Sequence, residues 1–381
     1  MTIPASLIQL ETSPDRRPNL LALGGSDLET LLQGWGWPRY RAGQIRRWLY
    51  AKRVRTIDAM TDLSHDDRAW LHERATIRRL ASRTIKRAGD GTRKFLFALE
   101  DGLTVESVLI PHGERRTLCV SSQVGCTFDC GFCLTGTMGL RRNLKAHEIV
   151  DQVLSVQDDL GEDERLSNLV FMGMGEPLAN FDAVAEALQC LTNTSWGLGV
   201  AARRITLSTA GLASRIQDVA PLGVHLAISL NATTEAQRTA LMPAASRTAS
   251  LHTLLQACHT FPLKARDRLT FEYVLLAGEN DSLADARRLI GLLRGLRCKV
   301  NLIPFNEFPN APYRRPSEAA VESFQGVLRR AGFDVFVRKS KGPDVLGACG
   351  QLGSQPTEHP RLDSVPNRLL ACRERSRRTS E

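Results

Sequence analysis

The feature that most constrains this chain is a group of three cysteines in one short segment. Cys126, Cys130 and Cys133 follow the spacing C-x3-C-x2-C, and no fourth cysteine occurs within the next fifty residues. Three thiolates at this spacing can hold three corners of a 4Fe-4S cluster and leave one iron without a protein ligand. An open iron can chelate S-adenosylmethionine and, once reduced, transfer an electron to its sulfonium. The spacing therefore predicts radical chemistry.

A structural zinc ion is the main alternative for these cysteines, with His147 as a fourth ligand. Zinc sites usually contain paired C-x2-C knuckles, however, and this segment has one. A disulfide framework is not expected, because the 381 residues include only nine cysteines and the first ten residues do not resemble a secretory signal. No apolar run is as long as a membrane span, so the sequence predicts a cytoplasmic protein with no membrane partner.

Positive charge is concentrated in one part of the chain. The net charge is +9, yet the segment from Arg39 to Lys94 holds sixteen Lys or Arg against six Asp or Glu, a surplus of ten. Clustered cations gain free energy when they meet phosphates and release counterions, so such a segment is typical of nucleic-acid binding. A solvated helical face is the alternative that composition alone leaves open.

The pattern of apolar residues divides the chain into parts. Apolar residues recur at helical spacing between residues 26 and 80, as Ile45, Trp48 and Leu49 illustrate. The segments that follow predict a β-hairpin, then a regular alternation of strands and helices. We expect a helical accessory domain at 20–94, a hairpin linker at 95–116, a barrel domain at 117–353 and a basic, disordered tail at 354–381.

The barrel domain is predicted from six strand-like segments that alternate with helices. This order predicts an α/β fold in which a parallel sheet with right-handed crossovers forms a partial barrel of six (β/α) units. We expect strands at 117–121, 168–173, 204–208, 224–230, 269–276 and 299–304, a last strand at 334–338, and helices at 145–159, 182–193, 212–220, 250–261, 283–296 and 317–331.

Small and polar residues follow several of these strands at the end where such barrels place their sites. Their hydroxyl, amide and carboxylate groups suit hydrogen bonds to a ribose, an adenine edge and an amino acid, which are the polar parts of S-adenosylmethionine. Gly173 and Gly175 are found at the end of the second predicted barrel strand. Two glycines at the end of a strand often form only a turn, but this strand comes directly after the one that leads into the cysteine segment. The residues are Gly175, Glu176, Ser208, Ser229, Leu230, Asn231 and Asn306.

Two further cysteines stand apart from the candidates for core packing. Cys119 lies in the first barrel strand, and Cys349 lies between an alanine and a glycine in a loop that is rich in glycine. A thiol in such a loop can approach a ligand, whereas Cys190, Cys258 and Cys298 lie in or beside apolar segments and are interpreted as inert.

Several segments together resemble one enzyme family, the radical-SAM RNA adenine methyltransferases of the RlmN/Cfr type, and in particular its RlmN branch. The resemblance extends from about Leu28 to Leu352. Its motifs are the stretch from Thr117 to Cys126, the cysteine cluster, Arg142-Asn143-Leu144, Gly173-Met174-Gly175-Glu176-Pro177-Leu178, Leu207-Ser208-Thr209, Asn301-Leu302-Ile303-Pro304 and Ala348-Cys349-Gly350-Gln351-Leu352.

The resemblance implies a two-stage mechanism with two molecules of S-adenosylmethionine per turnover. One methylates Cys349, and the other, bound at the 4Fe-4S cluster, yields the radical that activates the S-methyl group for attack on adenine. Glu106 matches the family's general base, and Cys119 matches the cysteine that releases the product by forming a disulfide with Cys349. The helical domain matches the RNA-binding accessory domain, and an electron-donating reductase is implied as a partner.

The expected reaction is methylation of C2 of an adenosine in 23S ribosomal RNA, with tRNA as a second candidate substrate. A C8 methyltransferase of the Cfr type uses the same cysteines and base, so spacing does not separate the two. A zinc-bearing RNA-binding protein and a glycyl-radical activating enzyme are two competing hypotheses from different classes. The chain has Ser229-Leu230-Asn231 where the family commonly has Ser-Leu-His, and Pro304-Phe305-Asn306 where it often has Pro-Trp-Asn.

Overall fold

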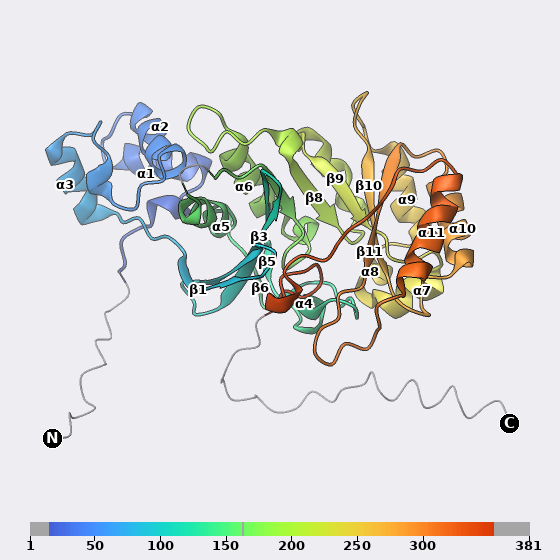
Figure 1. The fold of residues 1–381 in the computed structure, drawn as a ribbon. Coiled ribbons are helices and arrows are strands. Elements are labelled where there is room, and N and C mark those ends of the chain that lie inside the picture. The colour runs from blue at the N-terminus through green and yellow to red at the C-terminus, as the bar shows by residue number, and fades with distance from the viewer. Residues whose placement is uncertain (1–14, 162–163, 354–381) are drawn as a thin grey trace, which may run out of the picture.

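A computed structural model describes residues 15–161 and 164–353 (Figure 1). Within these residues, ten strands form one sheet in the order β1-β2-β3-β4-β7-β8-β9-β10-β11-β12, and β5 and β6 form a separate pair. Pairing is antiparallel from β1 to β4 and parallel from β4 to β12. The tail predicted at 354–381 lies outside the described residues.

The parallel half confirms the partial barrel. Its strands occur in chain order, each beside the one before, as in a (β/α) barrel. All six predicted strands are present, and the predicted last strand adds a seventh to the parallel set. They are β4 (Arg115–Cys119), β7 (Asn168–Phe171), β8 (Ile205–Thr209), β9 (His225–Ser229), β10 (Leu269–Leu275), β11 (Cys298–Pro304) and β12 (Val335–Val337).

Helices connect these strands and cover the sheet (Figure 1). Several begin at a capping side chain; Ser282, for example, accepts from the amide of Asp285, and the Asp285 carboxylate accepts from the amide of Ser282. The helices of this part are α5 (Ala146–Asp159), α6 (Phe181–Thr192), α7 (Glu235–Leu241), α8 (Pro243–Thr248), α9 (Leu251–Thr260), α10 (Leu283–Leu293) and α11 (Glu318–Arg330).

One predicted helix of the barrel is wrong. Residues 212–220 form two short 3-10 segments, η6 (Ala213–Arg215) and η7 (Gln217–Leu222), instead of an α-helix. Pro221 lies inside the second segment and has no amide hydrogen, so it cannot donate the bond that an α-helix would need there. The short helices α7 and α8 were not predicted.

The N-terminal part is helical, but only as far as Arg74. Its segments are η1 (Leu20–Ala22), α1 (Gly25–Gly34), α2 (Tyr40–Arg46), η2 (Arg47–Ala51), η3 (Ile57–Ala59) and α3 (His65–Arg74). Residues 81–87, which the predicted domain boundary had included in the helical part, form strand β1 (Ala81–Arg87). The predicted hairpin is confirmed as β2 (Arg93–Ala98) and β3 (Thr104–His112), and it continues the barrel sheet as far as β4.

Charged contacts join the helical part to the barrel. Arg53 and Arg55 both pair with Asp158 of α5 at 3.0 Å, and the buried Arg79 pairs with Asp151, which lies nearer the start of the same helix. α5 therefore forms the surface on which the N-terminal helices lie (Figure 1). Among the described residues, the helices are all too short or too polar to cross a membrane.

Candidate active site

The three predicted cluster cysteines lie in a loop between β5 (Gln123–Val124) and the short helix α4 (Leu134–Thr137). Two glycines make this loop possible. A Cβ atom at Gly125, where φ is +76°, would lie 1.8 Å from the carbonyl oxygen of Gly139, and a Cβ atom at Gly136 would lie 2.7 Å from the carbonyl oxygen of Cys130. Only residues without a side chain let the loop fold back on itself this closely.

Replacing Gly125 with alanine is therefore expected to destroy the loop. The clash and the positive φ should together lower the free energy of unfolding by about 2 kcal/mol or more and prevent iron binding. Chemical denaturation and iron analysis would measure both effects. Gly43→Ala is a suitable control, because Gly43 lies in α2 with open space around it and should gain stability from alanine. Normal iron content in Gly125→Ala would contradict this role for the glycine.

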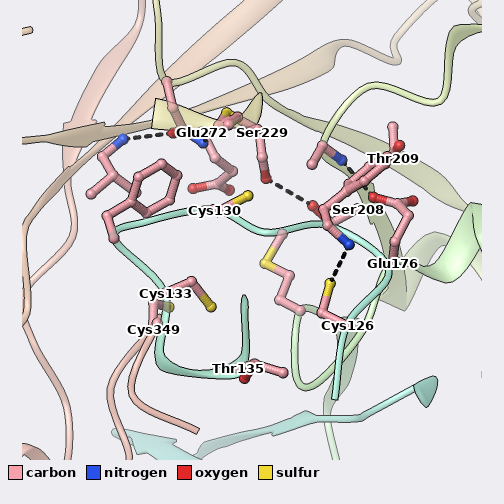
Figure 2. Close-up of a pocket in the computed structure, with 18 of the residues that line it drawn as sticks. Cys126, Cys130, Cys133, Thr135, Glu176, Ser208, Thr209, Ser229, Glu272 and Cys349 are labelled. Carbon is pink, nitrogen blue, oxygen red and sulfur yellow. Dashed lines mark hydrogen bonds between the residues drawn. The ribbon is translucent and has the colours of Figure 1, made fainter. Parts of the chain in front are cut away.

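The cysteine loop forms one wall of a cavity that is open to solvent. The opposite wall consists of the C-terminal ends of the barrel strands, as the sequence predicted. Figure 2 shows Cys126, Cys130 and Cys133 around this cavity, together with Glu176, Ser208 and Ser229. Of the predicted site residues, those that line the cavity are Cys126, Cys130, Cys133, Gly175, Glu176, Ser208, Ser229, Asn231, Asn306 and Cys349.

The three thiols suit a cationic metal centre. Burial raises the pKa of Cys126 to about 12 and also raises the pKa of Cys130 and Cys133, so these thiols need a nearby positive charge to become thiolates. Iron would supply that charge. The three soft sulfur donors facing one cavity fit a 4Fe-4S cluster, with Cys126, Cys130 and Cys133 as its ligands.

The zinc alternative with His147 is wrong. His147 lies in the first turn of α5 and lines a different cavity, together with Asp27, Tyr50, Glu186 and Cys190. In the described part of the chain, no three His, Cys, Asp or Glu side chains are arranged to hold a single metal ion.

Glu176 is fixed at the second strand end by backbone amides. One carboxylate oxygen accepts from the amide of Ala210 at 2.7 Å, the other accepts from the amide of Leu178 at 3.0 Å, and the side chain is 3% exposed. Burial raises the pKa of Glu176 to about 7, and the two amides act in the opposite direction. The carboxylate is therefore positioned to accept a hydrogen bond from an ammonium group in the cavity, which would favour its ionised form.

This carboxyl group should make the stability of the metal-free chain depend on pH. The pKa of Glu176 is about 7 in the folded chain against 4.5 for a free side chain, so the unfolded chain releases this proton first as the pH rises. Its contribution to stability should fall by about 3 kcal/mol between about pH 4.5 and pH 7. Chemical denaturation should show that Glu176→Gln loses less stability than the wild type over this range, and equal losses would contradict the burial effect.

The other residues predicted to bind S-adenosylmethionine differ in whether their side chains face the cavity or are already engaged within the protein. Ser208 and Ser229 face each other across neighbouring strands, with their hydroxyl oxygens 3.3 Å apart, and both line the cavity. Asn231 has a φ of +56°, and its side-chain oxygen accepts from the amide of Val274 at 2.9 Å. Leu230 is fully buried and packs in the hydrophobic core, so its side chain is a structural neighbour of the site.

Cys349 lies at the rim of the cavity, close to Cys133 (Figure 2). Its loop is joined to the cysteine loop, because the amide of Leu134 donates to the carbonyl oxygen of Gly350 at 2.7 Å. The side-chain amide of Asn306 donates to the carbonyl oxygen of Cys349 at 3.1 Å. Asn306 thus holds the loop of Cys349 as well as lining the cavity.

Cys119 and Glu106 lie on strands next to this loop and outside the cavity lining. Burial raises the pKa of Cys119 to about 12, the nearby Cys349 adds to the rise, and Arg338 opposes it. Glu106 pairs with Lys94 at 2.9 Å and accepts from the amide of Gly353 at 2.9 Å. Cys119 and Cys349 are both free thiols in the structure. The disulfide between them therefore stays a prediction for the product-release step.

Sequence reasoning missed two charged residues at this site. Glu272, on β10, lines the cavity at 4% exposure and accepts from the side chain of Asn301 at 2.8 Å. Arg338 follows β12 and lies 3.6 Å from Glu272, and its positive charge opposes the rise in the pKa of Cys349 that burial causes. An acidic residue inside an apolar strand is costly to bury, and that signal could have identified Glu272.

Comparison with known proteins agrees with this geometry. Residues 120–290 match the Radical SAM superfamily, and residues 18–77 match the ribosomal RNA large subunit methyltransferase N-terminal domain. The crystal structure of a radical SAM methyltransferase from Sphaerobacter thermophilus is 43% identical in sequence, has a TM-score of 0.82, and covers 88% of this chain and 98% of its own.

Two curated relatives carry the same name. The dual-specificity RNA methyltransferase RlmN of Desulfosudis oleivorans is 48% identical over 319 residues, which are 83% of this chain and 85% of that protein. The dual-specificity RNA methyltransferase RlmN of Solidesulfovibrio magneticus is 48% identical over 341 residues, 88% of this chain and 97% of that protein. The chain therefore belongs to the RlmN family of dual-specificity RNA methyltransferases, within the radical SAM superfamily.

Proposed function

We propose that this protein methylates C2 of an adenosine in 23S ribosomal RNA and in tRNA. The observation that carries the proposal is the shared cavity, where Cys126, Cys130 and Cys133 face the polar strand ends and Cys349 lies at the rim. The relatives named dual-specificity RNA methyltransferase support two RNA substrates over one. A purely structural role would not require a cavity between the cysteine loop and the polar strand ends, with a further, separate cysteine in its lining.

The cofactors of this reaction are a 4Fe-4S cluster and S-adenosylmethionine, two molecules of which are used per methyl transfer. When bound, they supply the methyl group and the abstraction of a hydrogen atom. Such chemistry suits C2 of adenine, because this carbon is not nucleophilic and cannot attack a sulfonium directly. Glu176, Ser208, Ser229 and Asn306 bind and orient the S-adenosylmethionine, and Gly175 lines the same cavity.

The chain's own residues carry the methyl group and the proton. The Cys349 thiol gives up its proton and takes the methyl group, so that this carbon is held at the rim of the cavity. Glu106 removes the proton from the substrate carbon after the new bond has formed. Cys119 then gives up its thiol proton and attacks the sulfur of Cys349. The bond between that sulfur and the methylene carbon breaks, and the carbon takes up a proton to become the methyl group of the released adenine. The remaining disulfide between Cys119 and Cys349 must be reduced before the next turnover.

The helical part at the N-terminus is the proposed RNA-binding domain. Its match to a ribosomal RNA methyltransferase N-terminal domain supports this role. The surplus of ten positive charges between Arg39 and Lys94 extends from these helices into β1 and the start of β2, so we include that part of the sheet in the proposed RNA-binding surface. A reductase supplies electrons from outside the chain, and the reaction takes place in the cytoplasm.

Mass spectrometry of digested RNA tests the proposal. RNA from cells with and without the gene is compared with standards of 2-methyladenosine and 8-methyladenosine, for 23S ribosomal RNA and tRNA separately. We expect 2-methyladenosine in both RNAs only when the gene is present. The 8-methyl product alone would assign the chain to C8 chemistry, and the absence of both products would contradict an adenosine methyltransferase.

A further inference from the structure

Arg238 is a fully buried cation that forms no ion pair with a carboxylate of residues 15–161 or 164–353. It lies on α7, its side chain is 0% exposed, and one guanidinium nitrogen, Nη2, donates to the carbonyl oxygen of Ala210 at 3.0 Å. Among the residues that the structure describes, the other two nitrogens, Nε and Nη1, have no hydrogen-bond partner. A buried charge left unpaired costs several kcal/mol, so a compensating negative charge is expected nearby.

The surroundings of Arg238 connect it to both walls of the cavity. Its guanidinium packs so closely on Gly211 that a Cβ atom there would lie 2.3 Å from Nη2. The neighbouring Ala210 donates its amide to Glu176. The last residue of α7, Leu241, accepts from the amide of Gly131 within the cysteine loop at 3.0 Å. Arg238 therefore lies outside the cavity, on a helix that contacts both the cysteine loop and the strand end near Glu176.

Cys130 and Glu235 supply the negative charges that act on this guanidinium. Burial lowers the pKa of Arg238, while Glu235 and a Cys130 thiolate both act to raise it. Glu235 is exposed to solvent, which screens its charge, and its carboxylate is engaged with the amide of Leu251 at 2.7 Å. Cys130 packs against the hydrophobic cluster that contains Leu241 of the same helix. As a buried, metal-bound thiolate it is the neighbour whose charge can compensate the buried cation.

We propose that Arg238 is the counter-charge of the iron-sulfur cluster, a positioning residue that stabilises the thiolate of Cys130 and the electron that reduces the cluster. The inference rests on the proposed function, because it requires a cluster on the three cysteines. With three thiolates, an oxidised 4Fe-4S core of charge +2 carries a net charge of −1, and one-electron reduction makes it −2, so a fixed cation nearby in a low dielectric favours the reduced state. Arg238 is outside the lining of the cavity, so it acts through the protein wall.

The first test is an EPR-monitored redox titration of the reconstituted protein. Arg238→Met keeps a long apolar side chain and removes the charge, and Arg238→Lys restores a charge. At a fixed potential we expect the ratio of reduced to oxidised cluster to fall about tenfold or more in Arg238→Met, equivalent to about 59 mV for a one-electron couple. Arg238→Lys should recover most of this loss. Equal potentials in wild type and Arg238→Met would overturn the proposal.

The second test compares unfolding temperatures with and without the cluster. In the metal-free full-length chain, removing an unpaired buried charge should leave the unfolding temperature of Arg238→Met equal to that of the wild type or higher. In the reconstituted protein the order should reverse, and a chelator should remove iron faster from the variant. A lower unfolding temperature by the same amount in both states would identify Arg238 as a packing residue and overturn the inference.

Arg247→Gln is the matched control. Arg247 lies on α8, 3.7 Å from Asp129 of the cysteine loop, but its side chain is 71% exposed. Solvent screens such a charge, so the potential should change little. If Arg247→Gln shifted the reduction potential as much as Arg238→Met, the burial of Arg238 would not be the cause of its effect on the potential. A loss of S-adenosylmethionine affinity in Arg238→Met without a change in potential would also overturn the proposal, since Arg238 would then serve the cofactor's carboxylate.

The two proposals can fail separately. A wild-type protein that binds no iron would contradict the proposed function before any variant is compared. A wild-type protein with an intact cluster, whose potential is unaffected by Arg238→Met, would leave the methyltransferase proposal standing and remove only the role of Arg238.

Discussion

Replacing Cys349 with alanine is expected to abolish RNA methylation, by more than about a thousandfold, while S-adenosylmethionine cleavage and iron binding persist. The reason is that Cys349 is separate from the three cluster cysteines and contributes only its thiol to the chemistry. The loop is held by two backbone carbonyl groups. The carbonyl oxygen of Cys349 accepts from the side chain of Asn306, and that of Gly350 accepts from the amide of Leu134, so neither contact depends on the thiol. The variant should therefore keep its fold.

Three measurements on the same protein separate these effects. Transfer of labelled methyl groups to RNA should vanish, 5′-deoxyadenosine should still form, and intact-mass analysis should find the single methyl group present in the wild type missing from the variant. Cys258→Ala, on the buried face of α9, is the control and should retain methylation. Methylation by Cys349→Ala would contradict the S-methylcysteine intermediate.

Replacing Cys119 with alanine is expected to trap RNA on the protein. Cys349 lies close enough to Cys119 to raise the pKa of its thiol, and Arg338 lies near both cysteines. Without the Cys119 thiol, the bond between the methyl carbon and the sulfur of Cys349 has no group to break it. A denaturing gel should show RNA migrating with the variant protein as a stable adduct.

The double variant Cys119→Ala with Cys349→Ala is the matched control for that gel. It should give no adduct, because no sulfur is left to carry the methyl carbon. Adduct in the double variant would place the linkage on another residue. No adduct in the single variant would mean that another group resolves the intermediate.

Local patterns predicted the features that depend on neighbours in the sequence. The cysteine loop could be predicted from one short segment, because its cysteine spacing and its glycines are local features. The polar residues at the strand ends could also be predicted, because each of them directly follows its own strand in the sequence. Parallel strands align their C-terminal ends, so Glu176, Ser208 and Ser229 came together as expected.

What the sequence did not reveal depends on contacts between distant segments. The exposed, charged residues of β1 do not alternate as a half-buried strand should, and only pairing with β2 makes them a strand. Arg238 is preceded by polar residues on a short helix, and nothing in that pattern indicates that its side chain is enclosed beside Ala210 and Gly211. Glu272 and Arg338 are 66 positions apart in the sequence and meet only in the folded barrel.

The most direct test of the central claim is analysis of iron, sulfide and zinc in protein purified without oxygen, followed by EPR with and without S-adenosylmethionine. We predict four irons and four sulfides per chain, as a 4Fe-4S cluster requires, and an EPR signal of the reduced cluster that changes when S-adenosylmethionine binds to the open iron. Substitution of any one of Cys126, Cys130 or Cys133 should remove the cluster. Stoichiometric zinc without iron, or a cluster signal that does not respond to S-adenosylmethionine, would contradict the proposed radical methyltransferase.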